Sequence, residues 1–261
     1  KRLYMILLIS PAKSLDYETP VPVRKHTQGE FLEDAKALMS TLRKLNPEQL
    51  SSLMHISEKL ADLNFQRNLN WQLPFTSDNA RQAIFAFTGD VYQGLEAYSL
   101  DSKDLTFAQK HLRILSGLYG ILRPLDLIQP YRLEMGSALK HGSNNSLYEY
   151  WGTRLAQHIN QELDSQRSNA VINLASNEYF KAVDKKTLKH PVISPVFKDY
   201  KNGKYKIISF FAKKARGYMA AWVIRNRVDN PDQIIDFDVA DYRYAASESS
   251  PDAPVFLRKE A

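Results

Sequence analysis

The chain has 261 residues, of which 44% are hydrophobic and 25% charged, proportions typical of a soluble globular protein. They exclude wholesale disorder and leave enough apolar side chains for a sizeable core. Because cysteine is absent, disulfides, thiolate nucleophiles, iron–sulfur clusters and cysteine-rich zinc sites are excluded. No apolar run is long enough to span a membrane, so we expect a cytoplasmic protein without a membrane partner. A single domain over residues 1–261 is the simplest organisation, with residues 1–4 as upstream sequence before the first methionine.

The net charge of +6 is spread unevenly along the chain. Residues 181–227 contain 13 lysines or arginines and only two acidic residues, whereas the segment from residue 229 onward is acidic. Concentrated positive charge beside acidic flanks indicates a polyanionic partner. The alternative is an ordinary solvated face coated by long lysine side chains.

The first half of the chain is predicted to be mainly helical. Residues 5–9 are the exception, since this continuous apolar run predicts a buried strand. Apolar residues at helical spacing predict the other elements. Three predicted helices cover residues 30–45, 79–87 and 105–115. Between the first two, one predicted helix is capped by Asn46 and begins at Pro47, and another is opened by Ser57.

In the second half, predicted strands alternate with helices. The Asn202-Gly203 pair between two apolar segments is a strong hairpin signal. This order favours an α+β fold, with a mixed sheet surrounded by helices, over regular βαβ repetition. The predicted strands are 131–135, 170–174, 192–197, 205–211 and 255–257, and the predicted helices are 146–163, capped by Ser146, and 213–227.

The common catalytic and cofactor motifs are missing from the sequence. The six histidines show no metal-ligand spacing, and no Gly-x-Ser-x-Gly motif occurs. The glycine-rich loops that hold nucleotide phosphates are also missing. We therefore expect neither a metal nor a cofactor.

Polar residues follow the first predicted strand in the turn Ser10-Pro11-Ala12-Lys13. The carboxyl end of a strand is where α/β-type sheets place ligand-binding groups. Lys13 could hold a phosphate there as a point charge. The alternative is a solvated lysine in a polar turn.

Residues 113–128 suggest a helix-hairpin-helix, the motif that binds the DNA backbone. A helix would end before Gly117, Gly117 and Gly120 would bracket the hairpin, and a short second helix would begin at Pro124, beside Arg123. Backbone N–H groups of such a hairpin bind phosphate. The Gly-x-x-Gly spacing departs from the usual pattern, and Pro124 lacks an N–H group. The alternative is a tight turn between helices with a glycine cap.

Two further segments carry candidate phosphate-binding charges. Arg132 and Glu134 alternate on a predicted strand and would share one face, as a surface ion pair or as part of a cleft. Lys213, Lys214 and Arg216 open a predicted helix and are interleaved with aromatic residues. Phosphate is bound favourably at such a helix start, and aromatic rings stack on bases.

Glu178 and Lys181 are the candidate catalytic pair. They lie three residues apart just after the strand predicted over residues 170–174, so a helix there would place them on one face. In a buried cleft the carboxylate could act as a general base and the amine could stabilise negative charge. If both are exposed, they form a weak surface pair.

Several of these segments, in order, resemble the bacterial YaaA family of peroxide stress resistance proteins. They are Ser10-Pro11-Ala12-Lys13, Phe87-Thr88-Gly89-Asp90-Val91-Tyr92-Gln93-Gly94-Leu95, Leu115-Ser116-Gly117-Leu118-Tyr119-Gly120 running on to Met135-Gly136, residues 173–181, and Lys213-Lys214-Ala215-Arg216-Gly217. The resemblance covers essentially the whole chain from residue 5 to about residue 256.

The resemblance implies a cytoplasmic protein that limits oxidative DNA damage and lowers free intracellular iron under hydrogen peroxide. It also implies DNA binding through a helix-hairpin-helix and a positively charged cleft in an unusual α+β fold. No settled catalytic residue set accompanies the family. Carried over onto this sequence, the resemblance puts the hairpin at Gly117–Gly120 and the cleft charges at Lys13, Arg123, Arg132, Lys181, Lys213, Lys214 and Arg216.

Three hypotheses follow for function. The first is a monomeric protein that contacts the DNA backbone with little sequence specificity. The second is a glycosylase-like enzyme acting on nucleic acid or a nucleotide, with Asp126, Glu134, Glu178 and Lys181 near polar strand ends. The third, which no ligand spacing supports, is direct iron binding by carboxylates.

Overall fold

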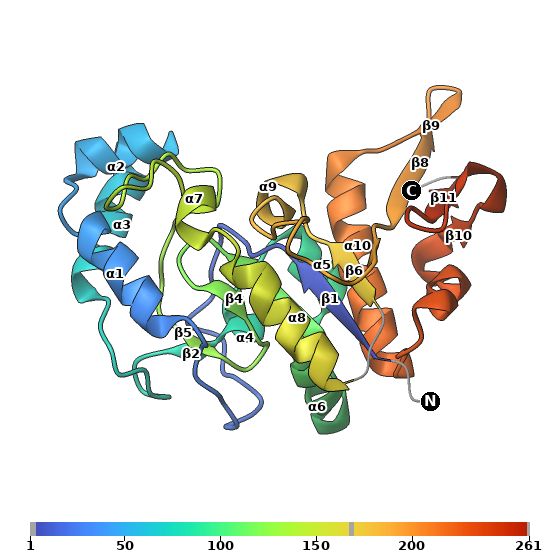
Figure 1. Cartoon of the computed structure of the whole chain (residues 1–261), viewed down its shortest axis with the longest axis horizontal. Helices are drawn as coiled ribbons and strands as arrows, with labels where there is room; N and C mark the ends of the chain where they lie inside the picture. Colours follow the sequence, from blue (N-terminus) through green and yellow to red (C-terminus); the bar gives the residue numbers. More distant parts are fainter. Residues whose placement is uncertain (1–3, 167–169, 260–261) are drawn as a thin grey trace.

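The structure is a computed structural model that describes residues 4–166 and 170–259, and a five-stranded sheet forms its centre (Figure 1). The strand order is β4-β3-β1-β6-β7. The middle strand β1 (Met5–Ile9) pairs in parallel with β3 (Leu112–Ser116) and with β6 (Ala170–Leu174). Every residue of β1 is buried, as expected for an apolar strand covered on both faces.

The remaining strands make this sheet mixed and build two smaller ones. At its edges, β4 (Gly120–Leu122) pairs antiparallel with β3, and β7 (Val192–Ile193) pairs in parallel with β6. The predicted mixed sheet is therefore confirmed. A second sheet has the order β10 (Arg243–Tyr244), β11 (Val255–Arg258), β8 (Val196–Lys201) and β9 (Lys204–Lys206), and β2 (Arg81–Gln82) pairs with β5 (Leu127–Ile128).

Helices pack around these sheets. The α-helices are α1 (Leu32–Leu42), α2 (Pro47–Met54), α3 (Glu58–Asn70), α4 (Ala83–Ala86), α5 (Asp90–Leu95), α6 (Ser102–His111), α7 (Leu147–Trp151), α8 (Arg154–Gln166), α9 (Asn177–Phe180) and α10 (Ser209–Asn226). Short 3₁₀ helices are η1 (Ala97–Ser99), η2 (Pro231–Asp236), η3 (Val239–Asp241) and η4 (Ala246–Glu248).

The connections between the central parallel strands define a switch in direction. From β1 the chain passes through α1–α6 to β3 on one side, and from β3 it returns through α7 and α8 to β6 on the other side. Right-handed connections place these helices on opposite faces, and α8 crosses the near face in Figure 1. Ligands of open α/β sheets bind at the carboxyl ends of the strands at such a switch, here between β1 and β6.

The predicted helix starts are confirmed at three caps. The Asn46 side chain accepts a hydrogen bond from the N–H of Gln49 in a reciprocal capping box, with Pro47 in the first turn. The hydroxyl oxygens of Ser57 and Ser146 cap α3 and α7 by accepting hydrogen bonds from the N–H groups of Leu60 and Glu149. Side-chain oxygens satisfy N–H groups that the first turn of a helix leaves unpaired.

The predicted helix-hairpin-helix is wrong. Residues 112–122 form the β3–β4 hairpin, in which Ile114 lies opposite Leu122, and the residues after Pro124 form a turn and not a helix. Gly117 and Gly120 are buried in this hairpin. A Cβ atom on Gly117 would lie 2.2 Å from the carbonyl oxygen of Leu133, and Gly120, at φ +71°, abuts Trp151. The glycines therefore serve close packing within the core.

Other element boundaries also differ from prediction. The helix expected over residues 105–115 stops at His111, because the buried run that follows is strand β3, and periodicity alone does not separate a buried strand from a helix. The strand expected over residues 205–211 ends at Lys206, and α10 starts three residues later. Residues 131–135 pair with no strand, and Gly152 divides the helix expected over 146–163.

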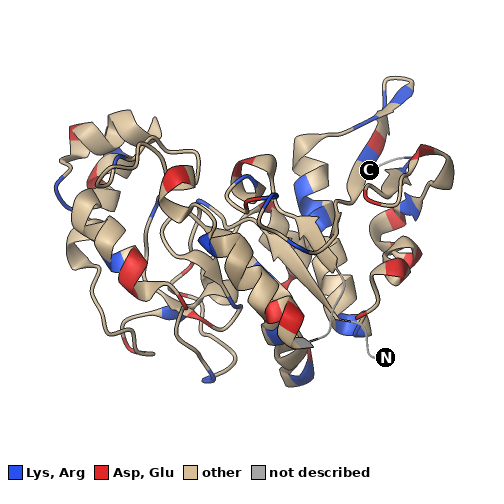
Figure 2. Cartoon of the chain, in the orientation of Figure 1, with Lys and Arg blue, Asp and Glu red and all other residues tan. Residues whose placement is uncertain are grey.

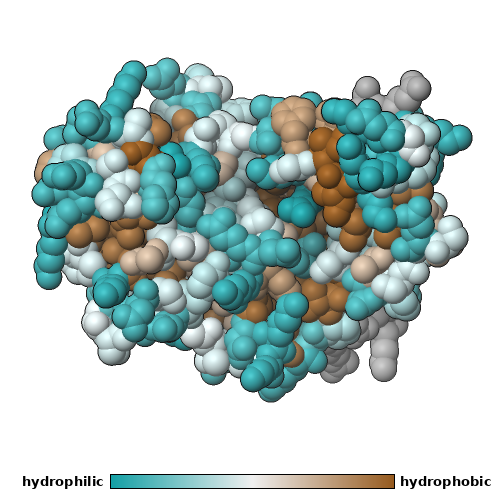
Figure 3. Space-filling view, turned by 90° about the horizontal axis from the view of Figure 1, so that it is seen from above, coloured by the Kyte–Doolittle hydropathy of each residue, from teal (hydrophilic) through white to brown (hydrophobic). Residues whose placement is uncertain are grey.

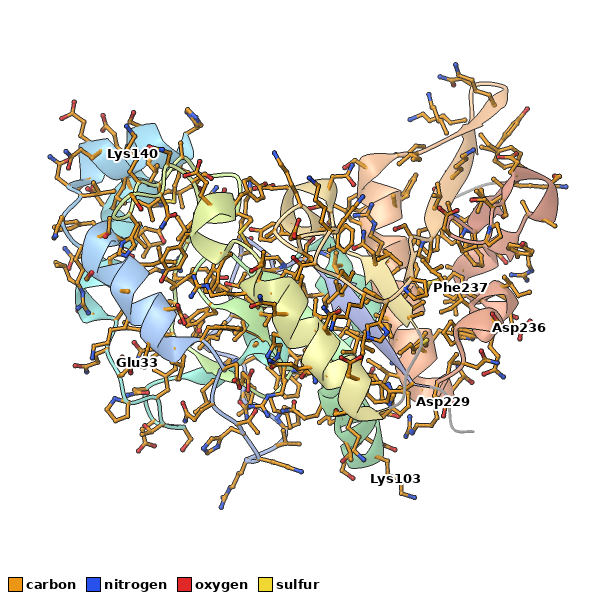
Figure 4. The ribbon with its side chains drawn as sticks, viewed as in Figure 1. Glu33, Lys103, Lys140, Asp229, Asp236 and Phe237 are labelled. Carbon is orange, nitrogen blue, oxygen red and sulfur yellow. The ribbon has the colours of Figure 1, made fainter. Side chains whose placement is uncertain are left out.

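An aromatic cluster attaches the second sheet to α10. The Phe237 ring, near α10 in Figure 4, lies 5.7 Å from the Trp222 ring of α10 and 5.9 Å from the Phe197 ring of β8. Phe256 of β11 completes the cluster at 5.5 Å from Phe237. Edge-to-face contacts of this kind add to the free energy of burying the rings. The β8–β9 hairpin is thus fixed relative to α10.

Across the described ranges, 4–166 and 170–259, no helix has the length and apolar character needed to cross a bilayer.

Candidate functional site

A cleft of about 370 Å³ opens at the carboxyl ends of β1 and β6, at the switch point of the central sheet. Its floor is formed by the segments that leave these two strands, and its walls come from the turn before α5 and from α10. Charged and polar side chains dominate the lining, including Ser10, Lys13, Asp90, Glu134, Ser176, Glu178, Lys213 and Arg216.

Two serines connect the strand ends at the floor of this cleft. The Ser176 N–H donates to the Ser10 hydroxyl oxygen over 2.9 Å, and the two hydroxyl oxygens lie 3.3 Å apart. The Tyr92 hydroxyl donates to the carbonyl oxygen of Ser10 over 3.0 Å, and burial raises the pKa of Tyr92 well above its ordinary value. These bonds hold the backbone of the floor in one arrangement.

Glu134 is the centre of a charged cluster in the cleft. Its Oε1 lies 3.1 Å from Nη2 of Arg132 and 3.3 Å from Nζ of Lys13. Arg132 and Glu134 share one side of an irregular extended segment, as the alternation predicted, while Tyr131, Leu133 and Met135 are buried on the other. Oε2 of Glu134 and Nε of Arg132 are buried and lack a hydrogen-bond partner.

The turn before α5 forms a wall that analysis of the sequence did not assign to the site. Thr88, Gly89, Asp90 and Tyr92 line the cleft. Gly89 has φ +115°, a conformation that side chains disfavour, and lies against Ala12 of the floor. The turn-forming Thr88-Gly89-Asp90 sequence was the signal that could have indicated this wall.

α10 contributes Lys213 and Arg216, which lie three residues apart on one side of the helix. Arg216 is half-buried, and no described residue forms an ion pair or side-chain hydrogen bond with its guanidinium. Burial lowers the pKa of Arg216 from its ordinary value, because its charge loses contact with water. The helix is held close to this wall, since Gly217 of α10 contacts the backbone of Val91 and Gly94 in α5.

Glu178 and Lys181 lie close in sequence but do not form an ion pair. Both are exposed. Glu178 lines the cleft, and its Oε1 accepts a hydrogen bond from the N–H of Gly136 over 3.0 Å. Nζ of Lys181 lies instead 4.7 Å from the centre of the Tyr148 ring. The structure therefore does not bring the two groups together as a buried acid–base pair.

Two other candidate charges lie away from the cleft. Arg123 forms an ion pair with Asp126, with Nη2 and Oδ1 3.0 Å apart, and donates to the carbonyl oxygen of Gln28. Burial raises the pKa of Asp126, although Thr27 and Arg123 bind its carboxylate. Lys214 does not line the cleft and lies 5.9 Å from the Tyr218 ring centre.

Four lysines, of which Lys213 also lines the cleft, form a surface that we call the basic ridge: Lys201, Lys204, Lys206 and Lys213. The first three lie on the β8–β9 hairpin and the fourth on the first turns of α10. Figure 2 shows this positive charge at the hairpin tip and the upper end of α10. Within the described ranges, no carboxylate lies within 4.0 Å of the amino group of any of the four.

The hairpin itself leaves these charges uncompensated. Lys201 lies directly opposite Lys204, and like charges at such a position repel each other. Lys206 lies opposite Asp199, but that carboxylate is buried and bound by Arg258 at 2.5 Å and by the Tyr242 hydroxyl at 2.8 Å. An anion on the ridge would relieve the repulsion.

Exposed apolar side chains lie beside the ridge. The exposed fractions are 60% for Ile207, 50% for Phe210 and 48% for Tyr200. Figure 3, which views the molecule from above, shows a hydrophobic group among hydrophilic residues right of the centre. Aromatic rings next to unpaired lysines are typical of surfaces that bind nucleic acid.

No group of three or more His, Asp or Glu residues is arranged to hold a metal ion in the part of the chain that the structure describes.

The comparisons with known proteins agree on one family. Residues 5–248 match the family described as peroxide stress protein YaaA. Similar proteins include a UPF0246 protein of Cellvibrio japonicus, 56% identical, and one of Alteromonas mediterranea, 55% identical, each over 256 residues. Another, of Paraburkholderia phytofirmans, is 52% identical over 257 residues. In each case the match covers 98% of this chain and 99% of the relative.

Proposed function

Because the chain belongs to the family of peroxide stress proteins YaaA, we propose that it acts in peroxide stress by binding DNA along the basic ridge. Bound protein would cover DNA and limit its oxidative damage. The observation that carries the proposal is the set of four lysines that have no carboxylate partner among the described residues. Lysines without partners bind phosphates by releasing condensed counterions from the nucleic acid.

The form of the ridge supports backbone contacts without sequence specificity. Ion pairs between lysine and phosphate position a protein on DNA and carry no base information. Phe210 and Tyr200 add exposed rings on which unpaired bases could stack. DNA would bind at the basic ridge and not, as the sequence suggested, at residues 117–120, because these residues are buried in the β3–β4 hairpin.

The glycosylase-like alternative is not favoured at the residues first considered for it. Glu178 and Lys181 are exposed and separate, and Asp126 is paired with Arg123 outside the cleft. A general base gains from burial and from a partner that tunes its pKa.

Binding to a DNA duplex should weaken steeply as salt increases. Four phosphate contacts give a slope of log affinity against log salt of about −3.6. Lys204→Gln combined with Lys206→Gln should make this slope shallower by roughly 1.8, because two contacts are lost. Fluorescence anisotropy with labelled duplexes of two unrelated sequences at several salt concentrations measures both slopes.

The matched control is Lys103→Gln combined with Lys140→Gln. These exposed lysines lie on α6 and near α1–α3, far from the hairpin in Figure 4, and the double variant loses the same net charge. Its slope should equal that of the wild type. Equal losses in both double variants, or no duplex binding at low salt, would refute the ridge as the interface.

A further inference from the structure

We infer that the cleft between β1 and β6 is a binding site for one nucleoside monophosphate unit, with its phosphate on Arg216 and Lys213. The unit could be a free nucleotide or an unpaired nucleotide of a DNA strand. This site is distinct from the basic ridge, apart from the shared Lys213, and does not depend on duplex binding there.

The position and size of the cleft suit a small organic ligand. It lies outside the carboxyl ends of β1 and β6 at the switch point of the sheet, where open α/β sheets bind ligands. Its volume of about 370 Å³ is within the range of roughly 300–1,000 Å³ for small-molecule sites. A bare phosphate would leave most of this space empty.

The position of the phosphate is indicated by the positive charges on the α10 wall of the cleft, which have no carboxylate partner among the described residues. Three carboxylates line the cleft, but Lys13 and Arg132 neutralise Glu134, and the Gly136 N–H binds Glu178. Asp90 is the third, at the start of α5. Arg216 and Lys213 have no ion-pair partner among the described residues, and Arg216 is already partly desolvated. A planar guanidinium in this state binds phosphate oxygens in pairs.

The rest of the ligand is indicated by Glu134, which also lines the cleft. Its Oε2 is a buried acceptor without a donor. The carboxylate therefore has unused acceptor capacity, which a sugar hydroxyl or a base N–H group of a ligand takes up when the carboxylate turns toward the cleft. Ala12, Val91, Tyr92 and Tyr179 add apolar and aromatic surface to the lining, against which a base can pack. A phosphate on Arg216 and Lys213, together with a hydrogen-bond donor to Glu134, describes a nucleotide.

Isothermal titration calorimetry with the four deoxynucleoside monophosphates and with inorganic phosphate tests this inference. The wild type should bind at least one nucleotide more tightly than it binds phosphate. Arg216→Gln should weaken the binding of both by about 10- to 100-fold, the effect of losing hydrogen bonds to a charged group. Arg216→Lys, which keeps the charge, should retain more affinity than Arg216→Gln.

Glu134→Gln separates the contacts to the phosphate from the contact to the nucleoside. It should weaken nucleotide binding about tenfold relative to phosphate binding, because the lost acceptor serves the nucleoside part alone, whereas the change in net charge acts on both anions. The ridge variant Lys204→Gln with Lys206→Gln should bind mononucleotides as the wild type does while losing duplex affinity. These variants therefore distinguish a wrong assignment of the nucleotide site in the cleft from a wrong assignment of the duplex interface on the basic ridge.

The source of the nucleotide is decided with a duplex that carries one bulged nucleotide. If the unit comes from DNA, Arg216→Gln abolishes any preference for the bulge over a fully paired duplex. If the unit is free, wild type and Arg216→Gln show no such preference, while mononucleotide binding persists in the wild type. The inference is overturned if no mononucleotide binds, if phosphate binds as tightly as every nucleotide, or if folded Arg216→Gln protein binds normally.

Discussion

Replacing Gly217 with alanine should destabilise the protein by about 3 kcal/mol or more, because the new methyl group has no space. A Cβ atom at this position would lie 1.9 Å from the carbonyl oxygen of Val91, and one on Gly94 would lie 2.2 Å from that of Lys214. Both clashes are with backbone atoms, so rotation of a side chain does not relieve them. Helices α5 and α10 would have to separate, and Arg216 would move away from the cleft.

Unfolding in urea, followed by circular dichroism, measures this effect. Gly29→Ala is the matched control, since a Cβ atom there meets its nearest neighbour, Leu32, at an ordinary 3.4 Å. Its midpoint should stay near that of the wild type. A Gly217→Ala protein as stable as the wild type would show that α5 and α10 do not cross as closely as described.

Glu162→Gln should cost about 3 kcal/mol at neutral pH, because it leaves Arg113 buried without its counter-charge. Arg113 of β3 has a side chain only 5% exposed, and its Nε and Nη2 each bind the Glu162 carboxylate, with an Nη2–Oε1 distance of 2.8 Å. Burial alone would raise the pKa of Glu162, but hydrogen bonds from His158 and Arg113 outweigh it and lower the pKa to about 2.

This shift sets the direction of the pH dependence. A carboxylate whose pKa is lower in the folded than in the unfolded state stabilises the fold fully above the unfolded value, here 4.5. The contribution disappears as the pH falls from about 4.5 to about 2. The stability difference between wild type and Glu162→Gln should therefore shrink through this window.

Thermal unfolding of both proteins between pH 7 and pH 2.5 measures this difference. Glu33→Gln serves as the control, because Glu33 is 83% exposed and its Oε2 lies 3.9 Å from Lys36, a pair worth little. A difference between wild type and Glu162→Gln that stays constant with pH would mean that the pKa of Glu162 is the same in the folded and unfolded protein.

The sequence predicts local structure best where a single residue type determines it. Asn46 and Ser57 are short polar side chains before apolar helical periods, and each caps a helix. Asn202 and Gly203 adopt positive φ angles of 54° and 79° in the β8–β9 turn. These choices depend on neighbours in the chain, so they need no knowledge of the tertiary structure.

Tertiary packing determines the parts that the sequence analysis predicted wrongly. Residues 112–115 are all buried, and only their place beside β1 makes them a strand. The spacing of Gly117 and Gly120 predicts a phosphate-binding hairpin, whereas contacts with Leu133 and Trp151, distant in sequence, require their small size. A sequence pattern does not contain these contacts.

Only part of the candidate site could be predicted, because the site also depends on tertiary contacts. Lys13, Arg132 and the pair Lys213 and Arg216 come from three separate segments and lie in or beside one cleft, where the family resemblance placed them. Arg123 carries the same positive charge, but its side chain binds Asp126 and the carbonyl oxygen of Gln28, away from the cleft. The wall formed by Thr88 and Gly89 was not assigned to the site, because the Thr88-Gly89-Asp90 sequence indicates a turn but not which surface that turn lines.

Lysine footprinting by mass spectrometry shows which surface of the protein DNA covers. The protein is acetylated with limiting reagent with and without saturating duplex DNA at low salt, and each lysine is quantified. The account predicts that DNA protects Lys201, Lys204, Lys206 and Lys213, while the exposed Lys103 and Lys140 react equally in both samples. Unchanged reactivity of the four ridge lysines, or equal protection of Lys103 and Lys140, would contradict it.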